Sequence, residues 1–410
     1  MSSSGLRVTG GVKGPRYDDG MHWRGILLGS AVLTAGAAVF FAAEVKLPPP
    51  FATPSVNNGP RVVPKPEGAK LSVPQGFHAE VWAEGFQKPR FMLLGPSNEL
   101  LLSDSASNGQ GAVYVIHNQQ RKKIIEGLDR PYGLALWKEY LYVAEPQSVK
   151  RYKYDAKAMT AAAGQEVVSL QGFSGGHWTR TVLFDPESQK LYVTVGSGSN
   201  VSPGEDPRRA AINRYNPDGS GHEIYASGLR NVIGLRWYPG THDLWAATQE
   251  RDALGDDLVP DYFTKVKQGA FYGWPFAYIG PNEDPRNKGM QPDLVKKTVV
   301  PDVLLGAHVA VLDMIFYTGK QFPQEYRGGA FLALHGSWNR AQRVGQSIAF
   351  IPFKDGKPAG PLREVLTGWM LSPSQREVWG RPVGLLQLPD GSLLITDDGG
   401  NKVWHLSYKG

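Results

Sequence analysis

The chain contains no cysteine among its 410 residues. This absence excludes disulfide bonds, thiolate metal sites and cysteine nucleophiles, although it is compatible with any cellular compartment. Dense tracts of lysine and arginine are also missing, and the net charge of +6 is modest for this length. A nucleic-acid partner is therefore not expected. A small anionic ligand would need only a few well-placed arginines.

Long amphipathic helical patterns are scarce, whereas turn formers and strand formers are plentiful. There are 49 Gly and 31 Pro beside 17 Tyr, 16 Phe and 11 Trp. Aromatic residues favour strands, and Gly and Pro favour the tight turns between them. With 41% hydrophobic residues, the chain is long enough for one or two domains with large cores. The composition predicts an all-β fold.

The N-terminal region contains one long stretch without charge, residues 25–43, preceded by the basic residues Arg7, Lys13, Arg16 and Arg24. This pattern predicts a transmembrane anchor with residues 1–24 as a cytoplasmic basic tail. A cleaved signal segment, with residues 35–37 as its small-residue cleavage site, is the alternative. Both interpretations place the bulk of the chain on the periplasmic or extracellular side, anchored to the inner membrane in the first case.

A proline-rich segment, residues 44–69, follows, with seven Pro between residues 47 and 68. Such a composition predicts an extended linker that lifts the remaining domain, residues 70–410, away from the membrane.

From residue 70 onward one pattern recurs: a charged residue, an apolar run, a turn and a second apolar strand. The leading charged residues are Arg90, Arg130, Arg180, Arg230, His308 and Arg381, at intervals of 40, 50, 50, 78 and 73 residues. A four-stranded blade takes about 40 to 50 residues. The repeats therefore predict a six-bladed β-propeller with an insertion in each long interval, and residues 71–85 supply the outer strand that closes the ring. A β-sandwich or two smaller β-domains are the alternatives.

In a propeller the inner strands line the central channel, so the leading residues would surround one mouth of it. A structural role, pairing with a nearby carboxylate or carbonyl, is favoured for Arg90 and Arg130. A functional role is favoured for Arg230 and Arg381, because unusual neighbours surround them. Arg180 and His308 stay open.

His177 lies in the loop that enters the third inner strand, directly after Gly175 and Gly176. A loop histidine is commonly just solvated. Here the two glycines permit close backbone approach and the position faces the predicted channel. Because imidazole titrates near neutrality, His177 is a candidate general base.

An acidic turn follows the fourth blade's second strand, with Glu250, Asp252, Asp256, Asp257 and Asp261 within twelve residues. Clustered oxygen ligands suit a hard cation such as Ca²⁺. The spacing does not match an EF-hand loop, so a solvated acidic loop is the alternative.

Several motifs occur in order between residues 71 and 408. They are SGGHWTR, VGSGSNV, EDPRRAAINRYNPDG, GLRN, ERDALGDDL, YGWP, HGSWNR, WGRPVG and LPDGSLLITDDGGN. In these motifs the chain resembles the glucose/sorbosone dehydrogenases, six-bladed propellers that use pyrroloquinoline quinone (PQQ) with Ca²⁺. The GSGSNV and HGSWNR stretches are most similar to the L-sorbosone dehydrogenase branch.

The resemblance implies roles for particular residues. His177 matches the general base, and Arg230 and Asn231 match the pair at the reactive quinone carbonyl. Arg381 matches an arginine that binds PQQ. The calcium position, partly formed by backbone carbonyls, falls on Glu250, Arg251 and Asp252.

The chain also departs from the glucose enzymes. They carry Gln-Gly-Pro at the calcium turn, and their second cofactor arginine is replaced here by Val383. Their cofactor-binding lysine has no clear counterpart, although Arg340 could substitute for it. His308 stands near a cofactor position of different residue type.

The expected function is PQQ- and Ca²⁺-dependent oxidation of a sugar or sugar aldehyde, of the sorbosone or aldose type. Hydride would pass to the quinone, and electrons would leave to a periplasmic or membrane acceptor. A calcium-dependent propeller lactonase or other hydrolase is one alternative. A non-catalytic propeller that binds a glycan or a protein is another.

Overall fold

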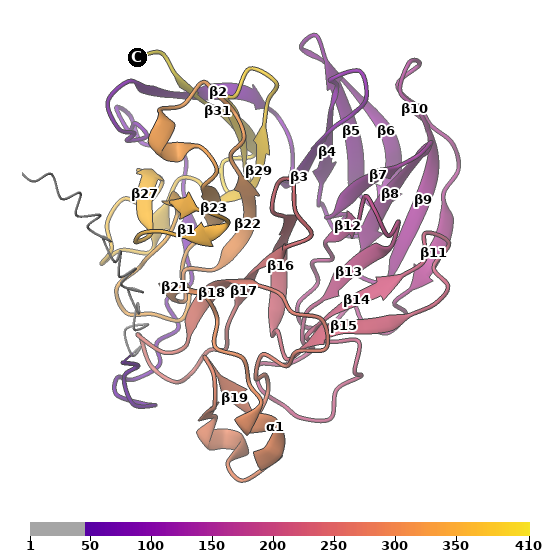
Figure 1. The fold of residues 1–410 in the computed structure, drawn as a ribbon. Coiled ribbons are helices and arrows are strands. Elements are labelled where there is room, and N and C mark those ends of the chain that lie inside the picture. The colour runs from indigo at the N-terminus through magenta and orange to yellow at the C-terminus, as the bar shows by residue number, and fades with distance from the viewer. Residues whose placement is uncertain (1–45) are drawn as a thin grey trace, which may run out of the picture. The chain divides into compact units, whose positions relative to one another are not determined.

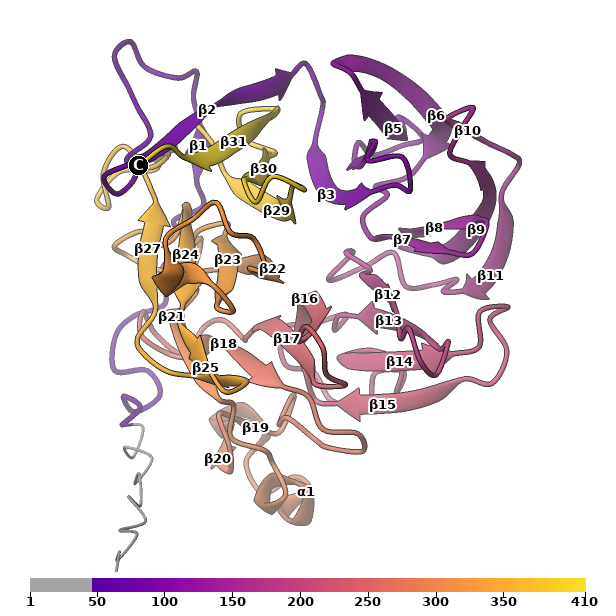
Figure 2. The ribbon, with the colours of Figure 1, turned by 45° about the horizontal axis from the view of Figure 1, so that its top comes forward.

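Six antiparallel sheets follow one another along the chain in the computed structural model, which describes residues 46–410. Figure 2 shows these sheets arranged as the blades of a ring, each running from the centre outward. Neighbouring blades contact one another through their innermost strands at five of the six junctions, β3 with β29 across the ring closure among them, and blade three contacts β16 through β13. The predicted six-bladed β-propeller is confirmed.

Each blade has four principal strands, and in the first five blades their order from the centre outward is the order of the chain (Figures 1 and 2). The innermost strands are β3 (Pro89–Leu94), β7 (Leu134–Trp137), β12 (Val182–Phe184), β16 (Asn231–Trp237), β22 (Val311–Phe316) and β29 (Pro382–Gln387). The second strands are β4 (Leu100–Asp104), β8 (Tyr140–Glu145), β13 (Leu191–Val195), β17 (Leu244–Gln249), β23 (Ala330–Leu334) and β30 (Leu393–Asp397). The third strands are β5 (Gly111–His117), β9 (Ser148–Asp155), β14 (Ala211–Tyr215), β18 (Pro260–Lys265), β24 (Ser347–Ile351) and β31 (Lys402–Tyr408). The outer strands are β6 (Gln120–Leu128), β11 (Gln165–Ser169), β15 (Glu223–Ser227), β21 (Val303–Ala307), β27 (Arg363–Leu366) and β2 (Phe77–Glu84).

Short elements extend some blades. The second blade carries a further strand, β10 (Thr160–Ala161). The fourth contains the larger insertion, with β19 (Ala277–Tyr278), β20 (Asn282–Glu283), the 3₁₀ helix η1 (Pro285–Asn287) and α1 (Pro292–Lys296). Figure 1 shows this insertion at the lower end of the view. The fifth has a small hairpin of β25 (Phe353–Lys354) and β26 (Lys357–Pro358).

The outermost strand of the last blade comes from the start of the domain. β2 pairs antiparallel with β31, with Phe77 opposite Tyr408. The last blade therefore contains strands from both ends of the propeller, and the predicted closure by residues 71–85 is confirmed.

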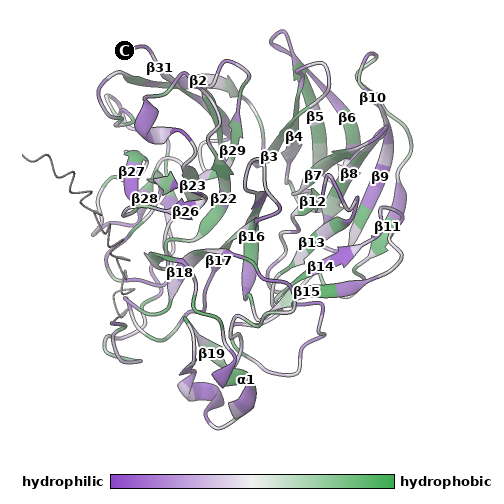
Figure 3. Cartoon of the chain, viewed as in Figure 1, coloured by the Kyte–Doolittle hydropathy of each residue, from purple (hydrophilic) through white to green (hydrophobic). Residues whose placement is uncertain are grey.

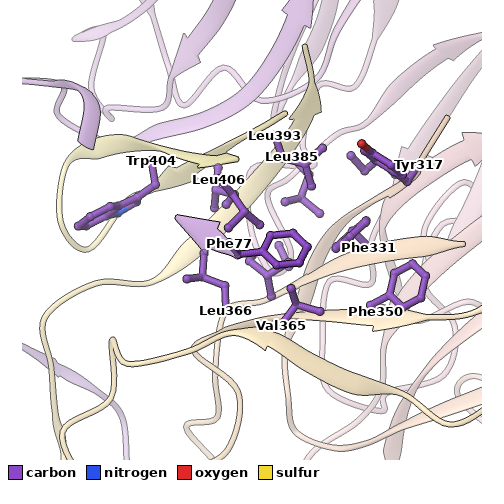
Figure 4. Close-up of a cluster of buried hydrophobic side chains, with 14 of the residues drawn as sticks. Phe77, Tyr317, Phe331, Phe350, Val365, Leu366, Leu385, Leu393, Trp404 and Leu406 are labelled. Atoms are coloured by element: carbon purple, nitrogen blue, oxygen red, sulfur yellow. The ribbon is translucent and has the colours of Figure 1, made fainter. Parts of the chain in front are cut away.

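The hydrophobic core lies between the faces of neighbouring blades. Figure 4 shows Phe77 and Trp404 of the sixth blade gathered with Phe331 and Phe350 of the fifth. Since both faces of a middle strand are covered, such a strand is apolar along its whole length, as in β23, where all five residues are buried. Figure 3 shows the apolar residues concentrated in the strands and the polar ones in many connecting loops.

The proline-rich segment is extended but packs on the propeller, unlike the free linker that its composition predicts. The amide of Asn58 donates to the carbonyl of Trp338 at 2.7 Å, and the amide of Asp256 donates to Oγ1 of Thr53 at 2.7 Å. Its strand β1 (Arg61–Val62) pairs parallel with β28 (Glu377–Val378). These backbone hydrogen bonds can form because only three of the seven Pro, residues 48–50, are consecutive.

The predicted basic tail, residues 1–24, and the anchor or signal segment, residues 25–43, lie outside the described residues. Within residues 46–410, no helix has the length and apolar character needed to cross a membrane.

A glycine in the last inner strand allows the closest approach across the ring closure. A Cβ at Gly384 of β29 would lie 2.1 Å from the carbonyl oxygen of Arg90 in β3. We expect Gly384→Ala to lower the free energy of unfolding by about 1 to 3 kcal/mol, because backbone atoms must shift. Gly59→Ala is the matched control, since its nearest atom is 3.8 Å away. Urea unfolding measures both, and equal losses would contradict this account of the closure.

Candidate functional site

The six leading charged residues lie at or just before the starts of the innermost strands, as predicted. These strands run in one direction along the channel, so their starts share one mouth of the ring. Two groups of side chains gather there. The first surrounds Arg230 and His177, and the second surrounds Arg381 and Arg90.

Arg230 immediately precedes β16 and is 5% exposed. Its Nη1 donates to the carbonyl of Glu250 at 2.7 Å, and its Nη2 lies 3.1 Å from Oδ2 of Asp252. The same Nη2 donates to Oδ1 of Asn200 at 3.0 Å. Burial lowers the pKa of Arg230, while Asp252 and Glu250 act to raise it. The guanidinium is thus fixed in direction by three partners.

His177 lies beside this group with a defined orientation. Its Nδ1 lies 2.9 Å from the carbonyl oxygen of Ser197 and 3.0 Å from the Ser197 hydroxyl. A carbonyl can only accept, so Nδ1 carries the proton and Nε2 keeps the lone pair. Burial, followed by the positive charge of Arg230, lowers the pKa of His177 to about 3. The ring is therefore neutral at ordinary pH, with Nε2 ready to accept a proton.

The loop that carries His177 is held by close backbone packing and by Arg180. Gly176 has φ 74°, and a Cβ there would be 2.5 Å from the Cα of Gly198. Arg180 is fully buried and donates to the carbonyls of His177 and Phe173, both at 2.7 Å. It also reaches the carbonyls of Thr179 and Pro146. The sequence left the role of Arg180 open, and in the structure this residue fixes the loop of His177.

The second group forms around a buried carboxylate, Asp398. Its Oδ2 lies 2.5 Å from Nη2 of Arg90, and its Oδ1 lies 2.9 Å from Nε2 of His335. Burial would raise the pKa of Asp398, but Arg90 and His335 hold it far below its usual range. Nε of Arg381 donates to the carbonyl of His335 at 3.2 Å. Burial lowers the pKa of Arg381 to about 10, which still leaves it charged at neutral pH.

Trp178, next to His177 in the sequence, connects the second group with Arg130. The guanidinium carbons of Arg90 and Arg130 lie 5.2 and 5.7 Å from the centre of the Trp178 ring. Such cation–π contacts orient a guanidinium without consuming its hydrogen-bond donors. Arg130 also pairs with Asp129 at 3.1 Å. Both arginines have the carboxylate partner that the sequence favoured for them.

Positive charge exceeds negative charge among these inner-strand residues. The five arginines meet three carboxylates, those of Asp129, Asp252 and Asp398. Several buried polar atoms near them have no hydrogen-bond partner, among them the donor Nε of Arg90 and the acceptors Oδ1 of Asn231 and Oε1 of Glu250. Buried polar atoms without partners are rare and call for an explanation such as a ligand. A planar ligand with several negative charges fits the excess of arginine donors.

The three residues that the sequence analysis assigned to calcium, Glu250, Arg251 and Asp252, form ion pairs in the structure. The side chain of Arg251 is fully buried, with Nε 2.9 Å from Oε2 of Glu250 and Nη1 3.1 Å from Oδ2 of Asp284. Oδ1 of Asp252 lies 3.3 Å from Nδ1 of His308, and its Oδ2 meets Arg230. Glu250 and Arg251 thus pair with each other. Asp252 already has two partners, which are Arg230 and His308.

The other acidic residues of the turn are engaged as well. Asp256 accepts from the amide of Ala341 at 3.0 Å, and Asp257 lies 2.8 Å from Nη2 of Arg340. Asp261 accepts from the amides of Glu250 and Ala310. Burial raises the pKa of Asp261 to about 7.

Across the described part of the chain, no three His, Asp or Glu side chains converge as metal ligands. One side-chain oxygen of the turn stays free, because Oε1 of Glu250 is buried without a hydrogen-bond partner.

The structure brings together most of the predicted site residues. His177, Arg230, Asn231, Asp252 and His308 share the first group. Nδ2 of Asn231 donates to Oε1 of Gln249, at the end of the strand that leads into Glu250. Arg340 stands apart from both groups, because it binds the carbonyl of Asp256 as well as Asp257.

The sequence prediction missed Asn200, Arg286, His335 and Asp398. Three of them lie inside motifs that carried the resemblance, namely VGSGSNV, HGSWNR and the final GSLLITDDGGN stretch. The residues around them in the sequence did not point to a role, because each acts through a hydrogen-bond partner that is distant along the chain. Arg286 lies in the blade-four insertion, where no motif marked it.

The chain is similar to known proteins both in sequence and in structure. The sequence model of the TrAA12-like family matches residues 71–269 and 284–409. An uncharacterized protein of Borreliella burgdorferi is 29% identical over 354 residues, covering 83% of this chain and 91% of the relative. A pyrroloquinoline quinone-dependent pyranose dehydrogenase of Coprinopsis cinerea is 30% identical over 194 residues, covering 43% of this chain and only 23% of that protein.

A solved structure agrees with the fold. It is a calcium structure of Trichoderma reesei Carbohydrate-Active Enzymes Family AA12, with a TM-score of 0.71 and 21% identity. The likeness covers 85% of this chain and 98% of that one.

Arg180 offers a test of the loop geometry. We expect Arg180→Ala to lower the free energy of unfolding by about 3 kcal/mol or more, because four backbone carbonyls lose a buried charged donor. Arg208→Ala, which removes a partly exposed pair with Asp206, serves as the control and should cost less than about 1 kcal/mol. Urea unfolding gives both values. Equal small losses would show that Arg180 does not hold the His177 loop.

Proposed function

The chain belongs to the TrAA12-like family, and from this premise we propose that it is a PQQ-dependent oxidoreductase that oxidises a sugar or a sugar aldehyde. The family agrees with the resemblance to sugar dehydrogenases seen in the sequence, and it specifies no sorbosone branch. The name of the Coprinopsis cinerea relative supports PQQ as the cofactor.

One observation carries the proposal: a neutral histidine base lies beside a fixed guanidinium, within an excess of positive charge. His177 keeps its Nε2 lone pair, and Arg230 presents a charge that stays in place. The lone pair of His177 can accept the proton of a hydroxyl. The fixed charge of Arg230 can stabilise negative charge on an oxygen.

The arginines of the second group fit the carboxylates of PQQ. Arg90 and Arg381 would hold them through charge-assisted hydrogen bonds, and Arg130 would add a third cation near Trp178. Nε of Arg90, which has no partner, would gain a hydrogen bond when the cofactor binds. When bound, PQQ supplies an ortho-quinone that accepts two electrons as a hydride from the sugar carbon.

The residues of the first group perform the remaining tasks. Nε2 of His177 takes the proton of the sugar hydroxyl as that carbon is oxidised. The Arg230 guanidinium would place its positive charge beside the quinone of bound PQQ, and Asp252 keeps the guanidinium in place. A sugar aldehyde would react through its hydrate, whose hydroxyl meets the same base and gives an acid as product.

The hydrolase alternative has little support in this site. A calcium-dependent hydrolase needs a metal to activate water or substrate, and the carboxylates of the acidic turn are already paired. A propeller that only binds a glycan or a protein would have no use for the orientation of His177.

Reconstitution tests the activity itself. Apo protein with added PQQ should change the cofactor absorption spectrum and reduce an artificial electron acceptor when a sugar is supplied. A panel of aldoses, ketoses and sugar aldehydes identifies the substrate class. The proposed function is wrong if PQQ causes no spectral change and no sugar in the panel supports turnover.

His177→Ala tests the general base. Loss of the proton acceptor should lower kcat about 100- to 10,000-fold while PQQ affinity stays within about threefold. His242→Ala, at an exposed histidine, is the matched control and should behave as wild type. The lowered pKa of His177 keeps the active, deprotonated form present in acid. The acid limb of the wild-type kcat/KM profile should therefore lie below the ordinary value of 6.5. Unchanged turnover in His177→Ala would remove the residue from this role.

A further inference from the structure

Residues 51–63 of the proline-rich segment, which we call the strap, contact loops of blades four, five and six. The amide of Phe51 donates to the carbonyl of Leu254 in the fourth blade, and the amide of Asn58 donates to the carbonyl of Trp338 in the fifth, both at 2.7 Å. Strand β1 of the strap pairs with β28, which leads into the sixth blade. The strap precedes residue 71, where the match to the TrAA12-like family begins, so the matched region does not include it.

Two of the loops that the strap contacts lie at the mouth of the ring that carries the site. The blade-four turn, residues 250–259, follows β17, which ends beside the start of β16 with Gln249 opposite Asn231. The blade-five loop, residues 335–346, follows β23, which likewise ends beside the start of β22. Because the innermost strands all start at this mouth, both loops lie beside the two groups of side chains.

The blade-five loop contacts both groups. At its start, Nε and Nη2 of Arg381 donate to the carbonyls of residues 335 and 336 at 3.2 and 3.4 Å. Further along, Oδ1 of Asn339 accepts from the amide of Ala253, the residue after Asp252, at 2.8 Å. The separation between Arg381 in the second group and Asp252 in the first therefore depends on where this loop lies.

The loop and the turn are also joined at Asp256. Nη1 of Arg340 donates to the carbonyl of Asp256 at 2.6 Å, and the amide of Ala341 donates to its Oδ1 at 3.0 Å. The strap binds the same residue, because Oγ1 of Thr53 accepts from the amide of Asp256 at 2.7 Å. Turn, loop and strap thus meet at one junction.

Asn58 connects the strap with the loop on the other side of this junction. Its Nδ2 donates to the carbonyls of residues 340 and 341 at 3.2 and 3.0 Å. Nη2 of Arg343, a buried side chain, donates to the carbonyl of Asn58 at 2.6 Å and to its Oδ1 at 3.2 Å. Nearby, Nδ2 of Asn339 donates to the carbonyl of Val56 at 2.9 Å. The loop is therefore fixed to the strap by side chains from both segments.

A rigid planar ligand that bridges two groups binds tightly only when those groups are held at the spacing that the ligand requires. The two groups belong to different blades, with Arg230 in the fourth and Arg381 in the sixth. The junction joins the loops that lie between them.

We propose that the strap is part of the cofactor site: through Asn58 and Thr53 it holds the blade-five loop against the blade-four turn, and this contact sets the spacing at which the two groups bind one PQQ molecule. The inference rests on the proposed function, because it concerns the cofactor of that same site. Asn58 and Thr53 are positioning residues, since their side chains bind the turn and the loop and not the arginines of either group.

The first experiment measures PQQ binding to the full chain by tryptophan quenching, in excess CaCl₂ so that any metal requirement is met. Asn58→Ala should raise the dissociation constant about tenfold or more, because the loop loses the hydrogen bonds of this side chain and the two groups lose their fixed spacing. Asn57→Ala is the matched control, because the adjacent Asn57 is the same residue type and is exposed. It should stay within about twofold of the wild type.

The second experiment uses Thr53, where a milder change and a conservative one are available. Thr53→Val removes the hydroxyl that accepts from the Asp256 amide and should raise the dissociation constant about threefold or more. Thr53→Ser keeps that acceptor and should restore the wild-type affinity within about twofold. Thr53→Val decides the outcome if circular dichroism shows that Asn58→Ala does not fold.

Turnover separates positioning of the cofactor from a general loss of structure. With each folded variant saturated by PQQ, the KM for the sugar should stay within about twofold of the wild-type value, because the strap holds the loops around the cofactor arginines. A side chain that only stabilises the fold would lower the thermal midpoint of unfolding and leave the PQQ affinity of the folded protein unchanged.

The outcomes distinguish the two proposals. If the wild type binds PQQ and the folded strap variants bind it as tightly as Asn57→Ala does, the role of the strap is overturned and the proposed function stands. The same conclusion follows if Thr53→Ser binds as weakly as Thr53→Val, or if the sugar KM rises as much as the PQQ dissociation constant. Absence of PQQ binding to the wild type would overturn the proposed function, and the inference would fall with it.

Discussion

Five arginines share one mouth of the ring, and their mutual repulsion is the constraint that the surrounding elements satisfy. The arrangement follows from the fold, because the innermost strands of all blades start at the same mouth. Asp398, Asp252 and Asp129 each neutralise one arginine, and the other two bind backbone carbonyls. The positive charge that remains suits an anionic cofactor. The same charge also acts on neighbours that are not arginines, His177 above all, because Arg230 and Arg180 both disfavour its protonated form.

The blade count could be predicted from the sequence because a charged residue and an apolar run recur at local spacing. The third strands of blades three and four, β14 and β18, show no continuous apolar run in the sequence. In β14 and β18 the apolar run is interrupted by residues such as Asn213 and Asp261, which are nonetheless buried. Their polar groups are satisfied by distant partners, the ring of His222 for Asn213 and two backbone amides for Asp261. A local pattern carries no information about such partners.

The site residues also fall into those that the sequence could identify and those that it could not. His177 and Arg230 could be identified because unusual residues and a family resemblance surround them in the sequence. His335 and Asp398 form one hydrogen bond but lie 63 residues apart, so neither marks the other. The acidic turn is the clearest case. Its carboxylates indicate a cation by composition, whereas the structure provides arginines and backbone amides for each of them. Composition shows which charges are present, and only the fold shows which of them are already paired.

Ring closure connects the stability of the propeller with the site. Val383, which stands where the glucose enzymes carry a second arginine, is fully buried in an apolar cluster with Phe91 and Leu134. It contributes packing and no charge. The neighbouring Gly384 lets the last inner strand approach the Arg90 backbone, and Asp398 of the last blade pairs with the Arg90 guanidinium. Arg90 thereby comes beside Arg381, although the two belong to opposite ends of the chain. The first blade thus supplies a cation at the point where the ring closes, beside the arginine of the last blade.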